Sequence, residues 1–402
     1  MTELLMPAGN LEKLEYAIKY GADAVYFGMV DFSLRSMKSG EIINRFNIKS
    51  AVEKARALGA KAYMTANIFA FDEDIKNLEE KMEMIKEAAP DAIIFSDFGV
   101  LRTLKKYLPD IPLHVSTQTN TLNTEAVKFW RDNGAKRIIL ARELSLEQIK
   151  KIRKNVPDIE LETFVHGAQC MSFSGRCLLS DYMTADERKA NHGNCAQPCR
   201  WNYKLLEETR PGEYYEIEEN DKWTTILSPK DLCLIEYIPA LIDAGVDSFK
   251  VEGRTKSTYY VSCIAKTYKN AINDYIKNGF IDNKYYINEV LKVRHRGYTT
   301  GFFLDKNQKG NYTYQKEPSD VGNTFCAQIL DKTDKGLKTL IKNNISMHEE
   351  YEFISPREQF FTKISAIVDE YGNQTEHAKT NDIVFLTFER PPLTYENGLL
   401  RR

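Results

Sequence analysis

The strongest constraint on the fold is an alternation of short apolar runs and amphipathic helical segments that continues to about residue 254. The opening, ELLMPAGNLEKLEYAIKYGADAVYFG, reads as an apolar strand, a helix with Leu11, Leu14 and Ile18 on one face, a stop at Gly21, and a second strand. Further buried-type strands are predicted at residues 61–67, 91–96, 112–117, 136–141 and 159–165. Strands separated by helices indicate the α/β class with a parallel sheet.

The stretch TILSPKDLCLIEYIPALIDAGVDSFKVEGR, from Thr225 to Arg254, repeats the order of the opening. Nine candidate strands precede residue 255, one more than a closed eight-stranded barrel requires, so we expect one to be peripheral. A doubly wound open sheet is the competing architecture, but no G-x-G-x-x-G follows the first strand. We therefore predict a (β/α)8 TIM-like barrel over residues 1–304, with a polar insertion at about 178–224.

The chain changes character after about residue 305. Short alternating runs such as TFCAQIL, EYEFISP and DIVFLTF are separated by turn sequences such as DKTDKG and EYGN. This pattern is typical of antiparallel hairpins. We predict a small antiparallel β-barrel domain over residues 305–402.

Length and charge restrict the classes of function. A chain of 402 residues suits one large domain and one small one, and a net charge of −2 means that any contact with nucleic acid must come from local patches. No apolar run is long enough to span a bilayer, and no signal-type segment follows Met1. We expect a cytoplasmic protein with no membrane partner.

Four of the seven cysteines are concentrated in thirty residues. Cys170, Cys177, Cys195 and Cys199 have the spacing C-x6-C-x17-C-x3-C, and Cys170 directly follows a predicted strand, where α/β barrels carry their chemistry. An odd number of cysteines without an export signal argues against a disulfide framework. The other three, Cys233, Cys263 and Cys326, lie in apolar runs and are interpreted as buried thiols.

Three chemistries compete for these four cysteines. Structural zinc sites usually contain a C-x2-C knuckle, which is missing here, whereas a 4Fe-4S cluster accepts thiolates from wider loops. Arg176 and Arg200 adjoin two of the cysteines and could offset the negative charge of such a cluster. A cysteine nucleophile paired with His166 is the third option, but it would leave three cysteines unexplained. The spacing favours the cluster without excluding zinc.

The motif E-x-F-x2-G-A-x-C-x4-G-x-C-x-L-S, at residues 162–180, resembles the signature of the collagenase-like peptidases of unassigned catalytic type. Gln169 departs from it, because the family usually has an aliphatic residue there. Similarity extends through LMPAGN, CRWNYKL and RGYTTGFF, so it covers nearly the whole chain. The chain is most similar to the branch that helps to form 5-hydroxyuridine at the tRNA wobble position in a prephenate-dependent reaction.

The resemblance implies a specific chemistry. Members of the family bind a 4Fe-4S cluster, and the matching ligands here are Cys170, Cys177, Cys195 and Cys199. We expect an oxygen-independent RNA hydroxylase with tRNA and prephenate as partners, acting alone or in a homo- or hetero-oligomer. The alternatives are a collagenase-like peptidase, or hydroxylation of another RNA or of an aromatic ring. The sequence contains neither G-x-S-x-G nor H-E-x-x-H, so it gives the peptidase little support.

Polar residues at the carboxyl ends of predicted strands are the candidates for substrate binding. They are His114, Gln118, Arg142, His166, Glu252 and Arg254, together with Arg176 beside Cys177. Prephenate is a dianion, which a fork-shaped guanidinium binds well, so the three arginines are the expected clamp. The two histidines could transfer protons near neutral pH. No general acid or base is assigned.

The segment KVRHRGYTTGFF is the candidate RNA contact. Lys292, Arg294 and Arg296 could bind phosphates, and Tyr298 could stack on a base. By analogy alone, the small β-barrel is a second candidate platform for RNA.

Overall fold

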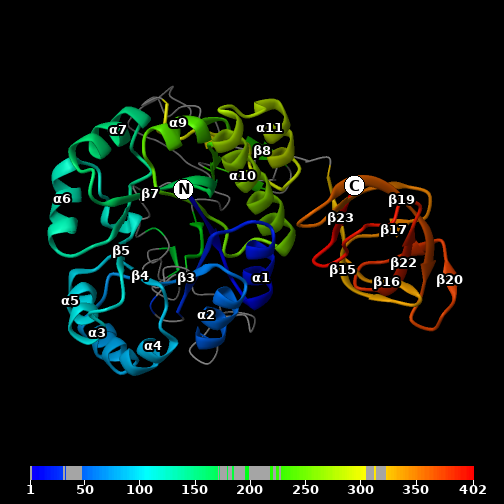
Figure 1. The fold of residues 1–402 in the computed structure, drawn as a ribbon, viewed down its shortest axis with the longest axis horizontal. Coiled ribbons are helices and arrows are strands. Elements are labelled where there is room, and N and C mark those ends of the chain that lie inside the picture. The colour runs from blue at the N-terminus through cyan, green and yellow to red at the C-terminus, as the bar shows by residue number, and fades with distance from the viewer. Residues whose placement is uncertain are drawn as a thin grey trace.

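The computed structural model describes residues 2–29, 32, 48–170, 172, 179, 183–184, 195–198, 218–220, 223–225, 228–304, 312–313 and 323–402. These residues form a large barrel ringed by helices and a smaller all-β barrel beside it (Figure 1). Among the described helices, none is long and apolar enough to cross a bilayer.

The large barrel is a closed ring of eight parallel strands within the described residues. Seven follow one another along the chain, and the eighth, β12, pairs with both β1 and β7 to close the ring. The strands are β1 (Glu3–Pro7), β2 (Ala24–Gly28), β3 (Lys61–Ala66), β4 (Ala92–Phe95), β5 (Leu113–Val115), β6 (Arg137–Ile139), β7 (Glu160–Ala168) and β12 (Ser248–Val251). The predicted TIM-like barrel is confirmed.

Helices cover the outside of the ring (Figure 1). They are α1 (Leu11–Lys19), α2 (Ile48–Ala57), α3 (Asp72–Glu79), α4 (Met82–Ala88), α5 (Phe98–Tyr107), α6 (Thr124–Asp132), α7 (Leu146–Asn155), α9 (Ile238–Asp243), α10 (Thr258–Asn278) and α11 (Asn283–Leu291), with short 3-10 turns η1 (Thr117–Thr119) and η5 (Ile235–Tyr237). At the start of many of these helices, a side chain accepts a hydrogen bond from a backbone N–H of the first turn, as Asn10 does for α1 and Ser257 for α10.

A strand outside the ring is β11 (Asp231–Cys233), which follows the candidate strand at 225–229 and occupies the start of the predicted helix. It runs antiparallel to the end of β7, outside the closed ring, and the two-residue strand β13 (Tyr298–Thr299) pairs with it. Gly167 of β7 permits this crossing, because its φ is +107° and an added Cβ would lie 2.3 Å from the Glu252 carbonyl oxygen. The end of β7 is therefore shared between the ring and its extension.

Short antiparallel pairs lie outside the ring. They join β8 (Glu218–Asn220) to β9 (Trp223–Thr225) and β10 (Ser228–Pro229) to β14 (Tyr312–Thr313). Most of the predicted insertion at 178–224 falls outside the described residues. So do residues 305–311 and 314–322, and the domain boundary at 304/305 therefore stays a prediction.

The predicted small β-barrel is also confirmed. Its six strands close because β18 pairs with both β19 and β23. They are β15 (Phe325–Thr333), β16 (Gly336–Ile341), β18 (Glu350–Ile354), β19 (Gln359–Val368), β22 (Ile383–Phe388) and β23 (Leu399–Arg401), with β20 (Gln374–Thr375) added at β19 and a separate pair, β17 (Ile345–Ser346) and β21 (His377–Ala378). Inward residues such as Phe353 and Ile364 form a second hydrophobic core.

Hydrogen bonds join the two barrels. The Tyr20 hydroxyl donates to the carbonyl oxygens of Ile354 (3.0 Å) and Asn397 (2.7 Å). Lys266 on α10 donates to the Ser355 carbonyl oxygen at 2.6 Å. The small barrel is thus attached to the outer helices, away from the mouth of the large one (Figure 1).

Candidate functional site

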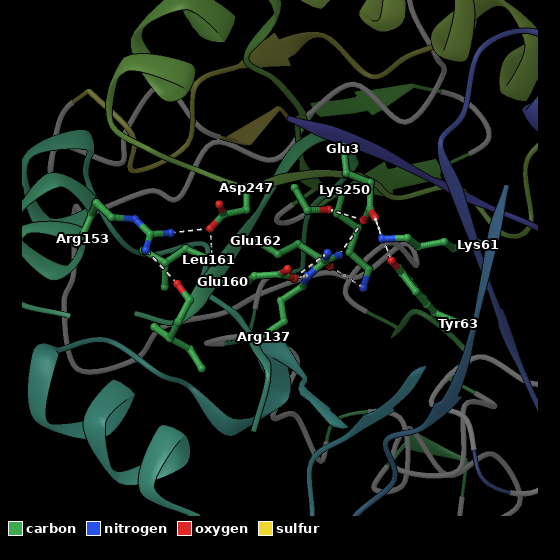
Figure 2. A network of polar contacts seen from close by, with 12 residues as sticks. Glu3, Lys61, Tyr63, Arg137, Arg153, Glu160, Leu161, Glu162, Asp247 and Lys250 are labelled. Atoms are coloured by element: carbon green, nitrogen blue, oxygen red, sulfur yellow. Dashed lines mark hydrogen bonds and ion pairs between the residues drawn. The ribbon is translucent and has the colours of Figure 1, made fainter. Parts of the chain in front are cut away.

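A network of buried charges fills the amino-terminal half of the large barrel (Figure 2). Arg137 lies at its centre: its Nη1 is 2.5 Å from Glu3 Oε1 and 3.0 Å from Glu162 Oε2. Lys250 Nζ is 2.9 Å from the other oxygen of Glu162, and the Tyr63 hydroxyl donates to Glu3 at 2.7 Å. Two buried cations thus face two buried carboxylates, and the charges balance.

Burial and pairing act in opposite directions on these groups. Burial raises the pKa of the Glu3 carboxyl, but the charge and hydrogen bonds of Arg137 outweigh it and leave that pKa below its usual value. Burial lowers the pKa of the Lys250 amine, and Glu162 opposes the change. The network is therefore a fixed structural base rather than a set of free acids and bases.

Aromatic rings lie near Lys250, toward the carboxyl ends of the strands. Its ammonium is 4.5 Å from the centre of the Tyr26 ring and 5.5 Å from that of Phe164. The Tyr26 hydroxyl donates to the Val251 carbonyl oxygen at 2.9 Å, which fixes that ring. These rings separate the charged base from the rim of the barrel.

Two of the predicted arginines lie at that rim. Arg142, after β6, is centred 3.8 Å from the Phe164 ring and donates to the Ala168 carbonyl oxygen at 2.8 Å. Arg254, after β12, is 5.9 Å from the Tyr26 ring and within 3.4 Å of Thr65 Oγ1. Both are partly exposed. The Arg142 guanidinium therefore lies against the end of β7, whereas the Arg254 guanidinium reaches residues of β2 and β3.

The other predicted rim residues differ in accessibility. Glu252 is buried, and Gln118 is half-buried in η1. His114 on β5 is buried against the Tyr63 ring, at 4.9 Å between ring centres, and its Nδ1 has no hydrogen-bond partner among the described residues. Burial and the nearby Arg137 and Lys250 hold its pKa well below the usual value. Arg176 lies outside the described residues.

His166 does not point to the barrel mouth, contrary to the expected position. The register of β7 against β12 shifts so that Phe164 faces Lys250 and His166 faces Val251, which leaves one residue between them unpaired. This bulge directs His166 outward to α10, where its Nδ1 lies 3.2 Å from the Tyr268 hydroxyl. Burial, partly offset by Asp231, lowers its pKa to about 3.

Two of the four predicted cluster ligands can be placed. Cys170 and Cys195 are both exposed, and Cys170 lies two residues beyond the end of β7. The Cys170 sulfur is 2.9 Å from Ser172 Oγ, and the Cys195 sulfur accepts the Gln197 backbone N–H at 3.3 Å. Cys177 and Cys199 lie outside the described residues, so the arrangement of the four stays a prediction.

The other three cysteines differ from this pair. Cys263 and Cys326 are buried, Cys233 is half-buried, and burial raises the pKa of each thiol to about 11. Their interpretation as ordinary core thiols is confirmed for the two buried ones. The two exposed thiols have no such packing role.

The predicted RNA segment is largely engaged within the protein. Lys292 pairs with Glu289 (2.5 Å) and Glu352 (3.2 Å), and Arg296 pairs with Asp231. The Tyr298 hydroxyl donates to the Val290 carbonyl oxygen at 2.9 Å. Arg294 is exposed. Of the four residues, it is the one whose side chain is open to solvent.

The network of charged residues at the base of the barrel was not predicted from the sequence. Glu3, Arg137 and Glu162 begin or interrupt otherwise apolar strands, and that pattern was the available signal. A charged residue inside a buried strand must meet an opposite charge, so their partners could have been sought on other strands.

With its functional candidates at the carboxyl ends of the strands, the molecule has the architecture of the TIM-barrel enzymes. Residues 9–313, more than half of the chain, match the model of Peptidase family U32, and the protein belongs to that family.

Relatives carry different names. "tRNA hydroxylation protein P1" of Bacillus subtilis is 36% identical over all of this chain and 94% of its own length. "Collagenase" of Porphyromonas gingivalis is 34% identical over 78% of this chain and 76% of its own. The "23S rRNA 5-hydroxycytidine C2501 synthase" of Escherichia coli is 34% identical over 80% of this chain and 48% of its own length.

Proposed function

We propose that this protein is an RNA-modifying enzyme of the cytoplasm that hydroxylates tRNA, forming 5-hydroxyuridine at the wobble position with prephenate as co-substrate and without molecular oxygen. The observation that carries the proposal is the similarity to a protein named for tRNA hydroxylation across both barrels. The relative named as a collagenase matches a smaller part of the chain.

The rim of the large barrel supports an anionic co-substrate. Arg142, after β6, and Arg254, after β12, each present a guanidinium group beside an aromatic ring. Guanidinium groups bind carboxylates through paired hydrogen bonds, and prephenate carries two carboxylates. Arg176 is proposed as a third member of the clamp.

Two exposed cysteines support the proposal of a 4Fe-4S cluster. Cys170 and Cys195 are exposed thiols, unlike the buried Cys263 and Cys326, and the sulfur of Cys195 accepts a backbone N–H bond of the kind that tunes iron–sulfur centres. We propose that they hold the cluster with Cys177 and Cys199. A bound cluster would supply a redox centre; the chain's own part is to supply the thiolates and the anion clamp.

A peptidase is the competing function, because one relative is named a collagenase. The described contacts do not favour it. Cys170 contacts Ser172, while His114 and His166 are buried and kept neutral by their lowered pKa values. Among the described residues, no contact joins the Cys170 thiol to an imidazole of the kind that activates a nucleophile.

Nucleoside analysis of a deletion strain tests the proposal. Total tRNA from cells lacking the gene, grown with and without oxygen, should lose 5-hydroxyuridine, and the wild-type gene should restore it in both conditions. Arg254→Ala should restore little, whereas Arg357→Ala, an exposed arginine of the small barrel, should restore it fully. Unchanged 5-hydroxyuridine in the deletion strain would reject the tRNA role. Gelatin cleavage by the purified protein, abolished by Cys170→Ser, would favour the peptidase.

A further inference from the structure

A groove of about 640 Å³ lies between the two barrels, apart from the mouth of the large one. We call it the interdomain groove; Tyr285, Asn288 and Leu291 of α11 form one wall and Gln359, Phe360 and Phe361 of β19 the other. Its volume falls within the roughly 300–1,000 Å³ typical of sites for small organic groups. We propose that the interdomain groove binds an unstacked nucleobase of the RNA substrate, an inference that rests on the proposed function.

Each wall presents an aromatic ring to solvent. Phe361 is 59% exposed and Tyr285 is 44% exposed, which is unusual for rings of this size. Strand alternation explains the first: Phe360 faces the core of the small barrel, so Phe361 must face outward. Exposed rings beside a groove are the common means by which proteins hold single-stranded bases, because every base has a face that can stack.

The floor of the interdomain groove is polar but electrically balanced. Glu289 and Glu352 line it, and they are matched by Arg401 and Lys292 at 2.5–3.2 Å. A balanced floor has no net attraction for a phosphate or carboxylate. It suits a neutral planar group that can also form hydrogen bonds, and a nucleobase has this chemistry.

Amide groups could bind the edge of such a base. Gln359 Nε2 donates to Glu352 Oε1 at 2.7 Å, which orients the amide and directs its donor to the floor. Among the described residues, nothing donates to its carbonyl oxygen, which is therefore available as an acceptor. Asn288 is exposed on the opposite wall and offers both a donor and an acceptor.

The geometry does not favour a peptide. An extended peptide binds by adding to a free strand edge, but β19 is paired with β18 on one side and β22 on the other. An amphipathic helix needs an apolar floor, whereas this floor carries carboxylates and an ammonium. A nucleobase that stacks on one or both rings, with the sugar-phosphate backbone of the RNA outside the groove, fits these walls.

The walls are fixed before the ligand arrives. Arg401 of the small barrel binds Glu289 on α11 at 2.8 Å, and Lys292 binds Glu352 of the small barrel at 3.2 Å. These ion pairs cross from one barrel to the other beneath the groove. A preformed site loses less conformational entropy on binding, so even one stacked base can contribute measurably to affinity.

Photo-crosslinking and binding with the full-length protein test the proposal. tRNA that is transcribed in vitro with 5-iodouridine in place of uridine should crosslink to Tyr285 or Phe361, and mass spectrometry should map the crosslinked residue. Phe361→Ala and Tyr285→Ala should each weaken binding of fluorescein-labelled tRNA about tenfold, the loss of one stacked base, and Phe361→Trp should retain it. Tyr371→Ala is the matched control, because Tyr371 is 91% exposed on the same barrel but lies in the turn after β19. Thermal unfolding should show that each variant is folded.

Salt dependence separates stacking from phosphate binding. Because the floor is neutral, the tenfold loss in Phe361→Ala should be the same at 50 and 200 mM salt, whereas a lost phosphate contact would change the slope. If wild-type protein binds and hydroxylates tRNA while both alanine variants bind equally well and crosslinks map elsewhere, the groove proposal is overturned and the proposed function stands. If wild-type protein neither binds nor hydroxylates RNA, both are overturned.

Discussion

Arg401 of the small barrel binds Glu289 on α11 of the large barrel at 2.8 Å, with the arginine side chain fully excluded from solvent. The same guanidinium binds Glu352 at 2.8 Å. A single buried cation therefore joins carboxylates from both barrels. Arg401 is therefore one of the contacts through which the stability of the small barrel depends on the large one.

Replacing Arg401 with methionine should destabilise the protein by about 3 kcal/mol, because among the described residues it leaves two buried carboxylates with a single cation, Lys292. Denaturant unfolding and limited proteolysis at the junction of the barrels are the measurements. Arg402→Met is the matched control: Arg402 is adjacent, but its pair with Glu349 is half-exposed, so the change should cost less than about 1 kcal/mol. Equal effects of the two variants would contradict the assigned role of Arg401.

The charged base of the large barrel allows a similar comparison. Glu162 is fully buried and binds both Arg137 and Lys250, so Glu162→Gln should lower the free energy of unfolding by about 3 kcal/mol. Glu160, two residues earlier on the same strand, also binds Arg137, but its side chain is 52% exposed. Glu160→Gln should cost under about 1 kcal/mol in the same urea titration. A larger loss from Glu160→Gln would show that burial does not set the strength of these pairs.

Periodicity was sufficient to predict both barrels, because buried parallel strands and alternating antiparallel strands leave clear patterns along the sequence. The strand outside the ring, β11, was instead expected to be the start of a helix. The apolar residues of DIKNLEEKMEMIKEAA are spaced as on one face of a single helix, but the segment forms two helices, α3 and α4, separated at residues 80–81. The apolar face is nevertheless buried in both helices, because Leu78 of α3 and Met82 and Ile85 of α4 are buried.

Side-chain direction was harder to predict. In a strand that alternates regularly, the side chain of His166 would point into the barrel, as that of Phe164 does. A bulge between them turns the His166 side chain outward, and the local sequence ETFVHGA does not indicate a bulge. The engagement of Arg296 could not be predicted, because its partner Asp231 is distant in sequence, whereas one partner of Lys292, Glu289, lies only three residues earlier. The exposure of Cys170 was predictable, since it follows directly from a strand end.

The buried histidine gives a test by pH. Burial lowers the pKa of His166 to about 3 in the folded protein, whereas in the unfolded chain it takes up a proton near pH 6.5. The unfolded state therefore binds more protons, and this contribution to stability is present above about pH 6.5 and declines as the pH falls toward 3. Between pH 7 and 5.5 the loss should be about 1 kcal/mol for His166 and should have the same sign for His114.

Denaturant titrations of wild-type protein and His166→Gln at both pH values separate this contribution from the others. The variant should show a smaller change between pH 7 and 5.5, whatever its absolute stability, and carboxylates contribute little in this range because they titrate lower. An identical change in wild type and variant would mean that His166 is protonated in the folded state.

The last prediction concerns the thiols. Cys170→Ser should abolish binding of iron and sulfide if Cys170 is a cluster ligand, because serine is a poor substitute for a thiolate. Cys326→Ser is the matched control: Cys326 is buried in the small barrel and contacts the Thr324 carbonyl oxygen at 3.2 Å, so its loss should affect stability alone. Protein purified without oxygen and assayed for iron, sulfide and visible absorption distinguishes them. Four irons and four sulfides per chain are expected for wild type and Cys326→Ser, and close to none for Cys170→Ser. A colourless wild-type protein that contains one zinc would instead assign these cysteines to a structural zinc site and remove the redox centre from the proposed function.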